Sequence, residues 1–199
     1  MTTTFFLVRH ATHSLVDRVL VGRMSGVYLD RTGERQAERL ADLLAAQDIR
    51  VLQSSPRERA RDTAAPIAAQ TGVPIEVAEA ADEIDLGAWT GQAFEDLASD
   101  DGWQRWNTAR STARPPEGES MQEVQVRIVD HLERLHASHP GERVAIVSHA
   151  EVIRAAVLHY SGLSLDAFSQ IQIPPASVST LLIGGGEGRV TGMPQGVSA

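Results

Sequence analysis

The feature that most constrains the fold is a set of short apolar runs without polar alternation. The first run, Phe5-Phe6-Leu7-Val8, stops abruptly at Arg9-His10. A strand that is apolar at every position is buried on both faces, as in a mainly parallel sheet covered by helices on each side. Strands are therefore expected near residues 4–8, 50–53, 74–77, 143–147 and 177–183.

Apolar residues at helical spacing separate these strands. Thr32 is expected to cap a first helix, which extends to about residue 44. Ser55 is expected to cap a second helix, with Pro56 at its first position and its end near Gly72. Ser120 is expected to cap a third helix, because a capping-box glutamate follows three residues later. A fourth helix is expected over residues 151–160.

Strands that alternate with helices predict an α/β fold, a three-layer sandwich with a mainly parallel sheet and helices on both faces. The length of 199 residues suits one such domain, 1–199, and no linker divides it. Residues 80–119 are irregular and read as an insertion that caps one end of the sheet, with short helices near 94–97 and 103–106. Gly184-Gly185-Gly186 reads as a turn, and the tail from there to Ala199 as loose.

Composition excludes several kinds of chemistry. The chain has no Cys, which excludes disulfides, Cys-ligated zinc, iron–sulfur clusters and thiol nucleophiles. All 18 basic residues are Arg, so a P-loop lysine and Schiff-base chemistry are excluded as well. A net charge of −8 without basic stretches argues against nucleic acid or an anionic membrane as partner. No leader or transmembrane run stands out, and we expect a cytoplasmic protein.

Polar residues follow the strands where ligands bind in such folds. His10 follows the first strand and His149 the fourth, whereas Arg57 and Arg59 open the helix after the second. Because ligands bind at the carboxyl ends of parallel strands, two imidazoles and at least two guanidiniums are expected to converge there. The acidic loop 82–85 is a further candidate to join them. Arginine forks match phosphate oxygens, a carboxylate can move a proton, and neutral imidazole can attack phosphorus.

Each of these features alone is more often structural. An Arg-His pair after a strand usually lies at the surface, and arginines at a helix start usually face solvent. The pair His10 and His13 lacks the downstream ligands of a familiar zinc pattern. Trp89, Trp103 and Trp106 are more often packing anchors than a stacking surface. Only the combination of the features argues for a site.

Five motifs in order resemble those of the histidine phosphatase superfamily, whose best-known branch is the cofactor-dependent phosphoglycerate mutases. They are residues 7–11 (LVRHA), 55–64 (SPRERARDTA), 83–91 (EIDLGAWTG), 116–120 (PEGES) and 147–150 (VSHA). The resemblance spans the chain from Phe5 to about Arg154. It implies the phosphoglycerate mutase-like sandwich, with residues 80–119 capping the site.

The resemblance also implies a role for each polar residue. His10 is the implied nucleophile, which carries a transient phosphohistidine. Arg9, Arg59 and His149 are implied to hold the phosphoryl oxygens and to stabilise the charge that spreads over them during transfer. Glu83 is implied to protonate the leaving alcohol and then to activate water. No metal and no cofactor are required, because the cationic pocket neutralises the phosphoryl charge.

The chain departs from the family pattern after the first histidine. The family often has an asparagine a few residues on, whereas residues 16–18 (VDR) stand here. Arg18 and Arg23 are the candidates to supply the missing phosphate contact. Trp89 is a candidate substrate contact, since the tryptophans suggest an apolar wall, although the same residues also suit the interior of the insertion. Ala11 and Ala150 replace two glycines, which is a modest steric change.

The expected activity is hydrolysis of a phosphomonoester of a small metabolite. A phosphoglycerate mutase is the alternative, but mutases of the family carry an Arg-Arg pair and Lys in a longer insertion, and this chain has neither. A non-catalytic regulatory module is a further alternative, against which the presence of His10, Glu83 and the other implied residues argues. The substrate stays open among sugar phosphates, phosphoglycerates and nucleotide-derived or cofactor-precursor phosphates. A homodimer fits the family, and no sequence feature decides it.

Overall fold

The computed structural model describes residues 1–196, and side chains for residues 1–192. Within this range the strands form a single six-stranded sheet in the order β3-β2-β4-β1-β5-β6. Strands β1 to β4 pair in parallel, whereas β5 and β6 join antiparallel beyond β1, which confirms a mainly parallel sheet. The strands are β1 (Thr3–Arg9), β2 (Val51–Ser54), β3 (Ile75–Val77), β4 (Arg143–Ser148), β5 (Ser177–Gly184) and β6 (Glu187–Gly196).

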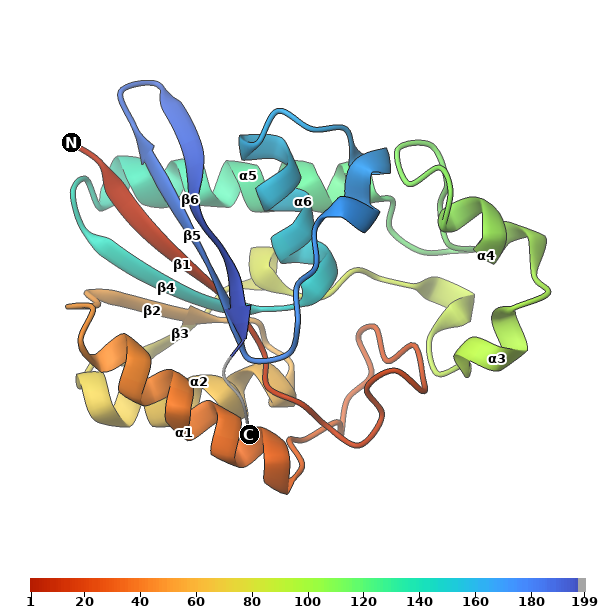
Figure 1. Cartoon of the computed structure of the whole chain (residues 1–199), viewed down its shortest axis with the longest axis horizontal. Helices are drawn as coiled ribbons and strands as arrows, with labels where there is room; N and C mark the ends of the chain where they lie inside the picture. Colours follow the sequence, from red (N-terminus) through yellow and green to blue (C-terminus); the bar gives the residue numbers. More distant parts are fainter. Residues whose placement is uncertain (197–199) are drawn as a thin grey trace.

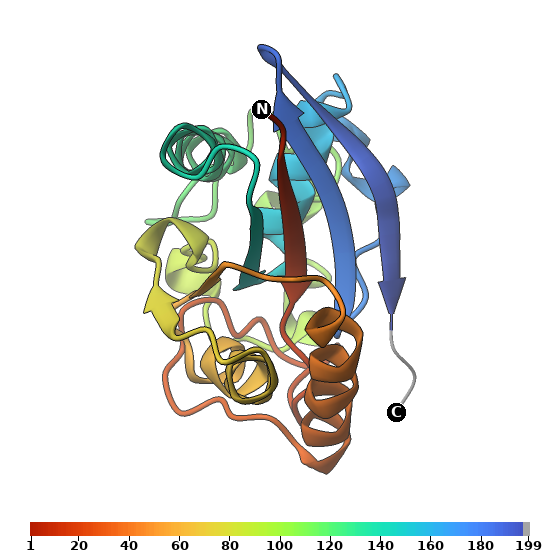
Figure 2. The same ribbon diagram turned by 90° about the vertical axis from the view of Figure 1, so that its left-hand side faces the viewer.

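Helices cover both faces of the sheet, as predicted (Figures 1 and 2). Helices α1 (Arg31–Ala45) and α2 (Glu58–Thr71) pack together on one face. Helices α5 (Met121–Ser138) and α6 (Ala150–Tyr160) pack together on the other. The three layers place the loops that follow β1, β2 and β4 at one edge of the sheet.

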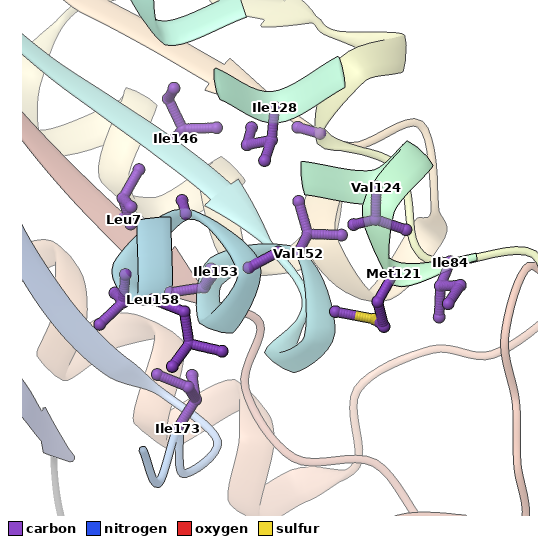
Figure 3. Packing of buried hydrophobic residues seen from close by; sticks show 14 of the residues in the cluster. Leu7, Ile84, Met121, Val124, Ile128, Ile146, Val152, Ile153, Leu158 and Ile173 are labelled. Atoms are coloured by element: carbon purple, nitrogen blue, oxygen red, sulfur yellow. The ribbon is translucent and has the colours of Figure 1, made fainter. Parts of the chain in front are cut away.

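The side chains of β1 alternate between two separate cores. Phe5 and Leu7 belong to the core beneath α5 and α6, whereas Phe6 and Val8 belong to the core beneath α1 and α2. Figure 3 shows Leu7 among the side chains of the first of these cores. Each face of the strand therefore removes apolar surface from water, which explains the uninterrupted apolar run in the sequence.

Helix α5 begins as the sequence predicts. Ser120 accepts a hydrogen bond from the backbone N–H of Glu123 (3.3 Å), and the Glu123 carboxylate accepts one from the backbone N–H of Ser120 (2.8 Å). Its buried stripe faces the sheet and α6 (Figure 3). The stripe consists of Met121, Val124, Ile128, Leu132 and Leu135.

Two predicted helix caps are wrong. Asp30, and not Thr32, caps α1, because its carboxylate accepts from the N–H of Gly33 at 2.8 Å. Helix α2 begins only at Glu58, after Arg57 in the capping position. The hydroxyl of Ser55 accepts from the backbone N–H of Arg57 (3.3 Å), before the helix begins, and also contacts two side chains of the site described below.

The prediction of a loose tail after residue 183 is wrong. Glycines at 185 and 186 adopt positive φ and form the predicted turn, after which residues 187–196 return as the edge strand β6. This segment contains Gly and Pro and has no regular apolar alternation, so it carries no strand signal of its own. Pairing with β5 supplies its order. Residues 197–199 lie outside the described residues.

The insertion 80–119 holds short elements beyond the carboxyl ends of β1, β2 and β4 (Figure 1). They are two 3₁₀ turns, Glu79–Ala81 and Gly87–Trp89, and the helices α3 (Phe94–Leu97) and α4 (Asp101–Trp106). Val19, in the loop after β1, bridges to Ala93 and ties that loop to the insertion. Within residues 1–196 no helix is long and apolar enough to cross a membrane.

Candidate active site

His10 and His149 lie side by side because their strands are neighbours. Arg9 at the end of β1 pairs with Ser148 at the end of β4, so the next residue of each strand is a histidine. The ring centroids are 5.1 Å apart, with the planes tilted by 60°. His10 is 3% exposed and His149 is fully buried.

The contacts of His10 determine which ring nitrogen is free to react. Its Nδ1 lies 2.8 Å from the carbonyl oxygen of Ala11, which can only accept, so Nδ1 carries the proton. Burial, followed by the nearby Arg59 and Arg9, lowers the pKa of His10 well below its ordinary value. The ring is therefore neutral, with the Nε2 lone pair available as a nucleophile.

Arg59, from the first turn of α2, lies against this nitrogen. Its Nε is 3.4 Å from Nε2 of His10, and Nη2 donates to the carbonyl of Gly22 (2.8 Å) and lies 3.1 Å from Nδ1 of His149. Nη1 is buried and has no hydrogen-bond partner among the described residues, and the same is true of Nε of Arg9. Buried unpaired guanidinium donors are costly, and an anion that accepts from them removes that cost.

Glu83 places a carboxyl group beside the two histidines. One oxygen accepts from the N–H of Ile84 (2.9 Å), and the other lies 3.7 Å from Nδ1 of His149. Burial raises the pKa of Glu83 to about 7, against the opposing effect of Arg59. A carboxyl group with this pKa can both give and take a proton near neutral pH.

A chain of polar side chains fixes the orientation of His149. Arg57 binds both carboxylate oxygens of Asp82, at 2.8 and 2.9 Å. Asp82 accepts from the hydroxyl of Ser55 (3.1 Å), and that hydroxyl lies 2.7 Å from Nε2 of His149. Because the serine donates its proton to Asp82, Nε2–H of His149 donates to the serine oxygen, which leaves Nδ1 to accept from Arg59.

A second network holds the loop that carries Glu83. Arg23 donates to the backbone carbonyl of Glu83 (2.7 Å), as does Arg127 (3.3 Å). Glu119 accepts from both arginines, at 3.0 Å from Arg23 and 2.7 Å from Arg127. We call Arg23, Glu119 and Arg127 the carbonyl clamp. It orders the backbone on which the carboxyl group depends.

A cavity of about 240 Å³ opens onto the reactive groups. Arg9, His10 and Glu83 line its inner end, whereas Arg59 and His149 lie directly behind them. The loop after β1 and the insertion supply the outer wall. The fold thus presents one nucleophilic nitrogen, one acid–base carboxyl and two arginines at the floor of a small chamber.

The structure brings together Arg9, His10, Arg59, Glu83 and His149, the five polar residues that the sequence singled out. It does not bring the three candidate substrate contacts to the cavity. Arg18 is exposed and does not line it. The side chain of Arg23 belongs to the carbonyl clamp, and Trp89 is 3% exposed, packed edge-on against Trp103 and Trp106.

Sequence reasoning missed two sets of residues. His13 is 4% exposed, lines the cavity and stacks on His10, with centroids 5.4 Å apart. Arg110 and Glu151 line the outer part and form an ion pair at 2.8 Å. The spacing of His13 three residues after His10 is the sequence signal that could place it in the site, whereas nothing in the sequence pairs Arg110 with Glu151.

Metal ligation has no candidate in residues 1–196. No group of three or more His, Asp or Glu side chains in this range is arranged to hold a metal ion.

Curated proteins of similar sequence match most of this chain. Phosphoserine phosphatase 1 of Hydrogenobacter thermophilus is 30% identical over 180 residues, which cover 88% of this chain and 84% of the relative. A probable phosphoglycerate mutase of Cronobacter sakazakii, GpmB, is 30% identical over 177 residues (87% and 82%). Both similarities span most of the two chains.

Solved structures show the same fold. Bacillus stearothermophilus YhfR is 27% identical with a TM-score of 0.89, and 96% of each chain is covered. A mycobacterial glucosyl-3-phosphoglycerate phosphatase has a TM-score of 0.87 at 23% identity, with 97% of this chain and 99% of that one covered. The family model of the histidine phosphatase superfamily (branch 1) matches residues 5–195, and the chain belongs to that superfamily.

Proposed function

We propose that the protein is a phosphomonoesterase that works through a phosphohistidine on His10. Nε2 of His10 attacks phosphorus, the ester P–O bond breaks, and the leaving oxygen takes the proton of Glu83. Water then gives a proton back to Glu83 and attacks phosphorus, so the P–N bond breaks and inorganic phosphate leaves. The two steps together restore the proton of Glu83 and the free Nε2 of His10.

One observation carries the proposal most directly: Nε2 of His10 is free to react within reach of unpaired guanidinium donors. Arg9 and Arg59 hold buried N–H groups that no described residue satisfies. A phosphoryl group bound to Nε2 brings oxygens to these donors and replaces the long contact from Arg59. Such preorganised donors stabilise the charge that spreads over the oxygens during transfer.

His13 is our candidate for the phosphoryl contact that the family asparagine provides elsewhere. Its Nδ1 accepts from the N–H of Leu15 (3.3 Å), so the proton of the neutral ring sits on Nε2. Burial, then Arg59 and Arg9, lowers the pKa of His13 to about 4, which keeps the ring neutral. Nε2–H has no partner among the described residues, and it is available to an oxygen of a group bound at His10.

Hydrolysis is favoured over phosphoglycerate mutase activity by the charges of the cavity. A mutase must hold a carboxylate as well as a phosphoryl group, and the outer lining offers Arg110 alone among its cations, already paired with Glu151. Phosphatase names occur among the relatives and neighbours, including ones for phosphoserine and α-ribazole phosphate, beside the mutase name. The alternative of a non-catalytic module conflicts with a reactive nitrogen and an acid of suitable pKa in one site.

We further propose that residues 1–199 act as one domain, with the insertion 80–119 closing the site over a small phosphorylated metabolite. The hydrogen bond from Leu20 N to Gln92 O (2.9 Å) and that from Gly91 N to Leu20 O (2.8 Å) support a fixed insertion. A cytoplasmic location and a homodimer stay predictions, which cell fractionation and analytical ultracentrifugation check.

The test is a hydrolysis screen with p-nitrophenyl phosphate and a panel of phosphorylated metabolites at acidic and neutral pH. We expect release of inorganic phosphate, no turnover by His10→Ala, and an acid-labile phosphoryl label on the wild type that His10→Ala lacks. A coupled assay with 2,3-bisphosphoglycerate reports mutase activity. Absence of hydrolysis throughout, or full activity of His10→Ala, contradicts the proposal.

A further inference from the structure

The chamber outside the phosphoryl pocket has a predominantly apolar wall. The loop after β1 contributes Val19 and Leu20 to this wall. The insertion 80–119 contributes the other apolar side chains, which are Leu86, Phe94, Trp103 and Trp106. Backbone hydrogen bonds between Leu20 and residues 91–92 join the two sides of this wall. It is therefore a built surface, and an apolar group that enters it leaves water.

The one cation of this outer part, Arg110, is already bound by Glu151, and only its buried Nε lacks a hydrogen-bond partner among the described residues. Arg110 donates to Glu151 (2.8 Å) and to the side-chain oxygen of Asn107 (3.3 Å). Its guanidinium carbon lies 4.4 Å from the ring centroid of Trp106 and 4.3 Å from that of Phe168. A substrate carboxylate that sought Arg110 would have to displace Glu151 and break this packing.

Two carboxylates, Glu151 and Asp17, line the same outer part, and Glu151 is ion-paired with both Arg110 and Arg154. Although burial raises the pKa of Glu151, Arg110 and Arg154 outweigh that effect and hold it at about 2, so the group is ionised at neutral pH. Asp17 adds an exposed carboxylate to the lining. Away from Arg9, the charged side chains of the lining are Arg110, Glu151 and Asp17, so the outer chamber presents two carboxylates and one arginine to whatever part of the substrate lies outside the phosphoryl pocket.

We propose that the substrate is a phosphate monoester of a small, uncharged and mainly apolar alcohol, bound with its phosphoryl group at His10 and its alcohol part against Leu20, Phe94 and Trp103. The inference rests on the proposed phosphatase function and names the substrate class for it. The volume of about 240 Å³ lies below the roughly 300–1,000 Å³ of sites that hold drug-sized molecules, so the alcohol is small.

The experiment compares monoalkyl phosphates from ethyl to hexyl, whose leaving alcohols have similar acidity. We expect kcat/KM to rise about three- to fourfold per methylene until the chamber is full. A carboxylate in place of the terminal methyl group should lower kcat/KM at least about tenfold, because its desolvation is not repaid. Phosphoserine and 3-phosphoglycerate should be poor substrates for the same reason.

Two variants of the wall and one control test whether this chamber causes the preference. Trp103→Ala should flatten the alkyl series, whereas Val126→Ala, at a site 61% exposed on α5 and outside this lining, should leave the series unchanged. Val19→Arg adds a cation to the wall and should reverse the preference, so that the carboxylated substrates react faster than the alkyl ones. This variant keeps every tryptophan, so it tests the proposal even where Trp103→Ala fails to fold.

Different results contradict the substrate class and the phosphatase function. Faster turnover of carboxylated than of alkyl phosphates by the wild type, or a steep alkyl series in a folded Trp103→Ala, overturns the substrate class and leaves the phosphatase function standing. Failure to hydrolyse any monoester overturns both.

Discussion

At the scale of single residues, the reactivity of this site depends on where each proton sits. Nδ1 of His10 is tied to a backbone carbonyl, and Nε2 of His149 to the hydroxyl of Ser55. Burial keeps both imidazoles neutral, while it raises the pKa of Glu83 to about 7. The same buried environment therefore keeps the lone pair of His10 unprotonated and keeps part of the Glu83 carboxyl groups protonated near neutral pH.

The pKa of Glu83 leads to a prediction about pH. The acid form needed by an alkoxide leaving group is present below about pH 7 and is lost above it, so kcat/KM for alkyl phosphates should fall on the alkaline side. Glu83→Gln should be slow and lack this fall. p-Nitrophenyl phosphate needs little protonation and serves as the control, for which Glu83→Gln should lose much less activity. Equal losses for both substrates would contradict the role as acid.

Variants of His13 distinguish the effect of ring stacking on His10 from the effect of a hydrogen bond to the phosphoryl group. His13→Phe keeps a ring against His10 but removes the Nε2–H donor. A hydrogen bond to a charged group contributes about 1.5–3 kcal/mol, so we expect kcat/KM to fall about ten- to hundredfold. Inhibition by vanadate should weaken in parallel, and His13→Asn should recover part of both. Unchanged kinetics in His13→Phe would show that the ring only packs.

At the scale of elements, the geometry depends on loops held by side chains from elsewhere in the chain. The carbonyl clamp joins the loop after β1, the start of α5 and the acid loop at Glu83. Gly87 adopts φ +50°, and a Cβ there would collide with the carbonyl of Pro116. The segment that follows Glu83 therefore packs tightly on the segment before α5. These contacts explain why the motifs at 83–91 and 116–120 occur together.

Glu119→Gln tests the clamp. Loss of the carboxylate frees Arg23 and Arg127 from their shared acceptor, and the Glu83 loop shifts. Since small misplacements of a reacting group are costly, kcat for alkyl phosphates should fall about ten- to hundredfold, with little change for p-nitrophenyl phosphate. Glu117→Gln, two residues away and exposed, is the matched control and should behave as wild type. A fall of equal size for both substrates would point to a structural effect alone.

At the scale of the whole molecule, two cores on either side of the sheet hold β1 and β4 together, and with them His10 and His149. Ile146 in β4 is fully buried beneath α5 and α6. The position of the histidines therefore rests on packing at a distance from them.

Ile146→Ala should lower the free energy of unfolding by about 2–5 kcal/mol, because it leaves a cavity under two helices. The urea midpoint measures this loss. Val126→Ala, at an exposed position of α5, should change stability by no more than about 0.5 kcal/mol. A loss in Ile146→Ala as small as that of the control would show that the core relaxes to fill the space.

Local patterns predicted much of this molecule. Apolar runs located the central strands, the capping box located α5, and the resemblance in five motifs singled out His10 and the four residues that the structure places around it. Patterns failed where contacts with distant parts of the chain decide the structure. Strand β6 forms because β5 offers it hydrogen bonds, and the hydroxyl of Ser55 contacts His149 and Asp82 while α2 begins only at Glu58.

The layers, the central strands and the candidate histidines could be read from the sequence alone, because burial patterns and motif spacing are properties of neighbouring residues. Which guanidinium lies against His10 depends on the tertiary structure. Arg59 is fully buried against His10, whereas Arg57 binds Asp82, Arg23 binds the Glu83 carbonyl and Arg110 binds Glu151. An arginine side chain is long and flexible, so the acceptor that meets it is set by elements packed from distant parts of the chain.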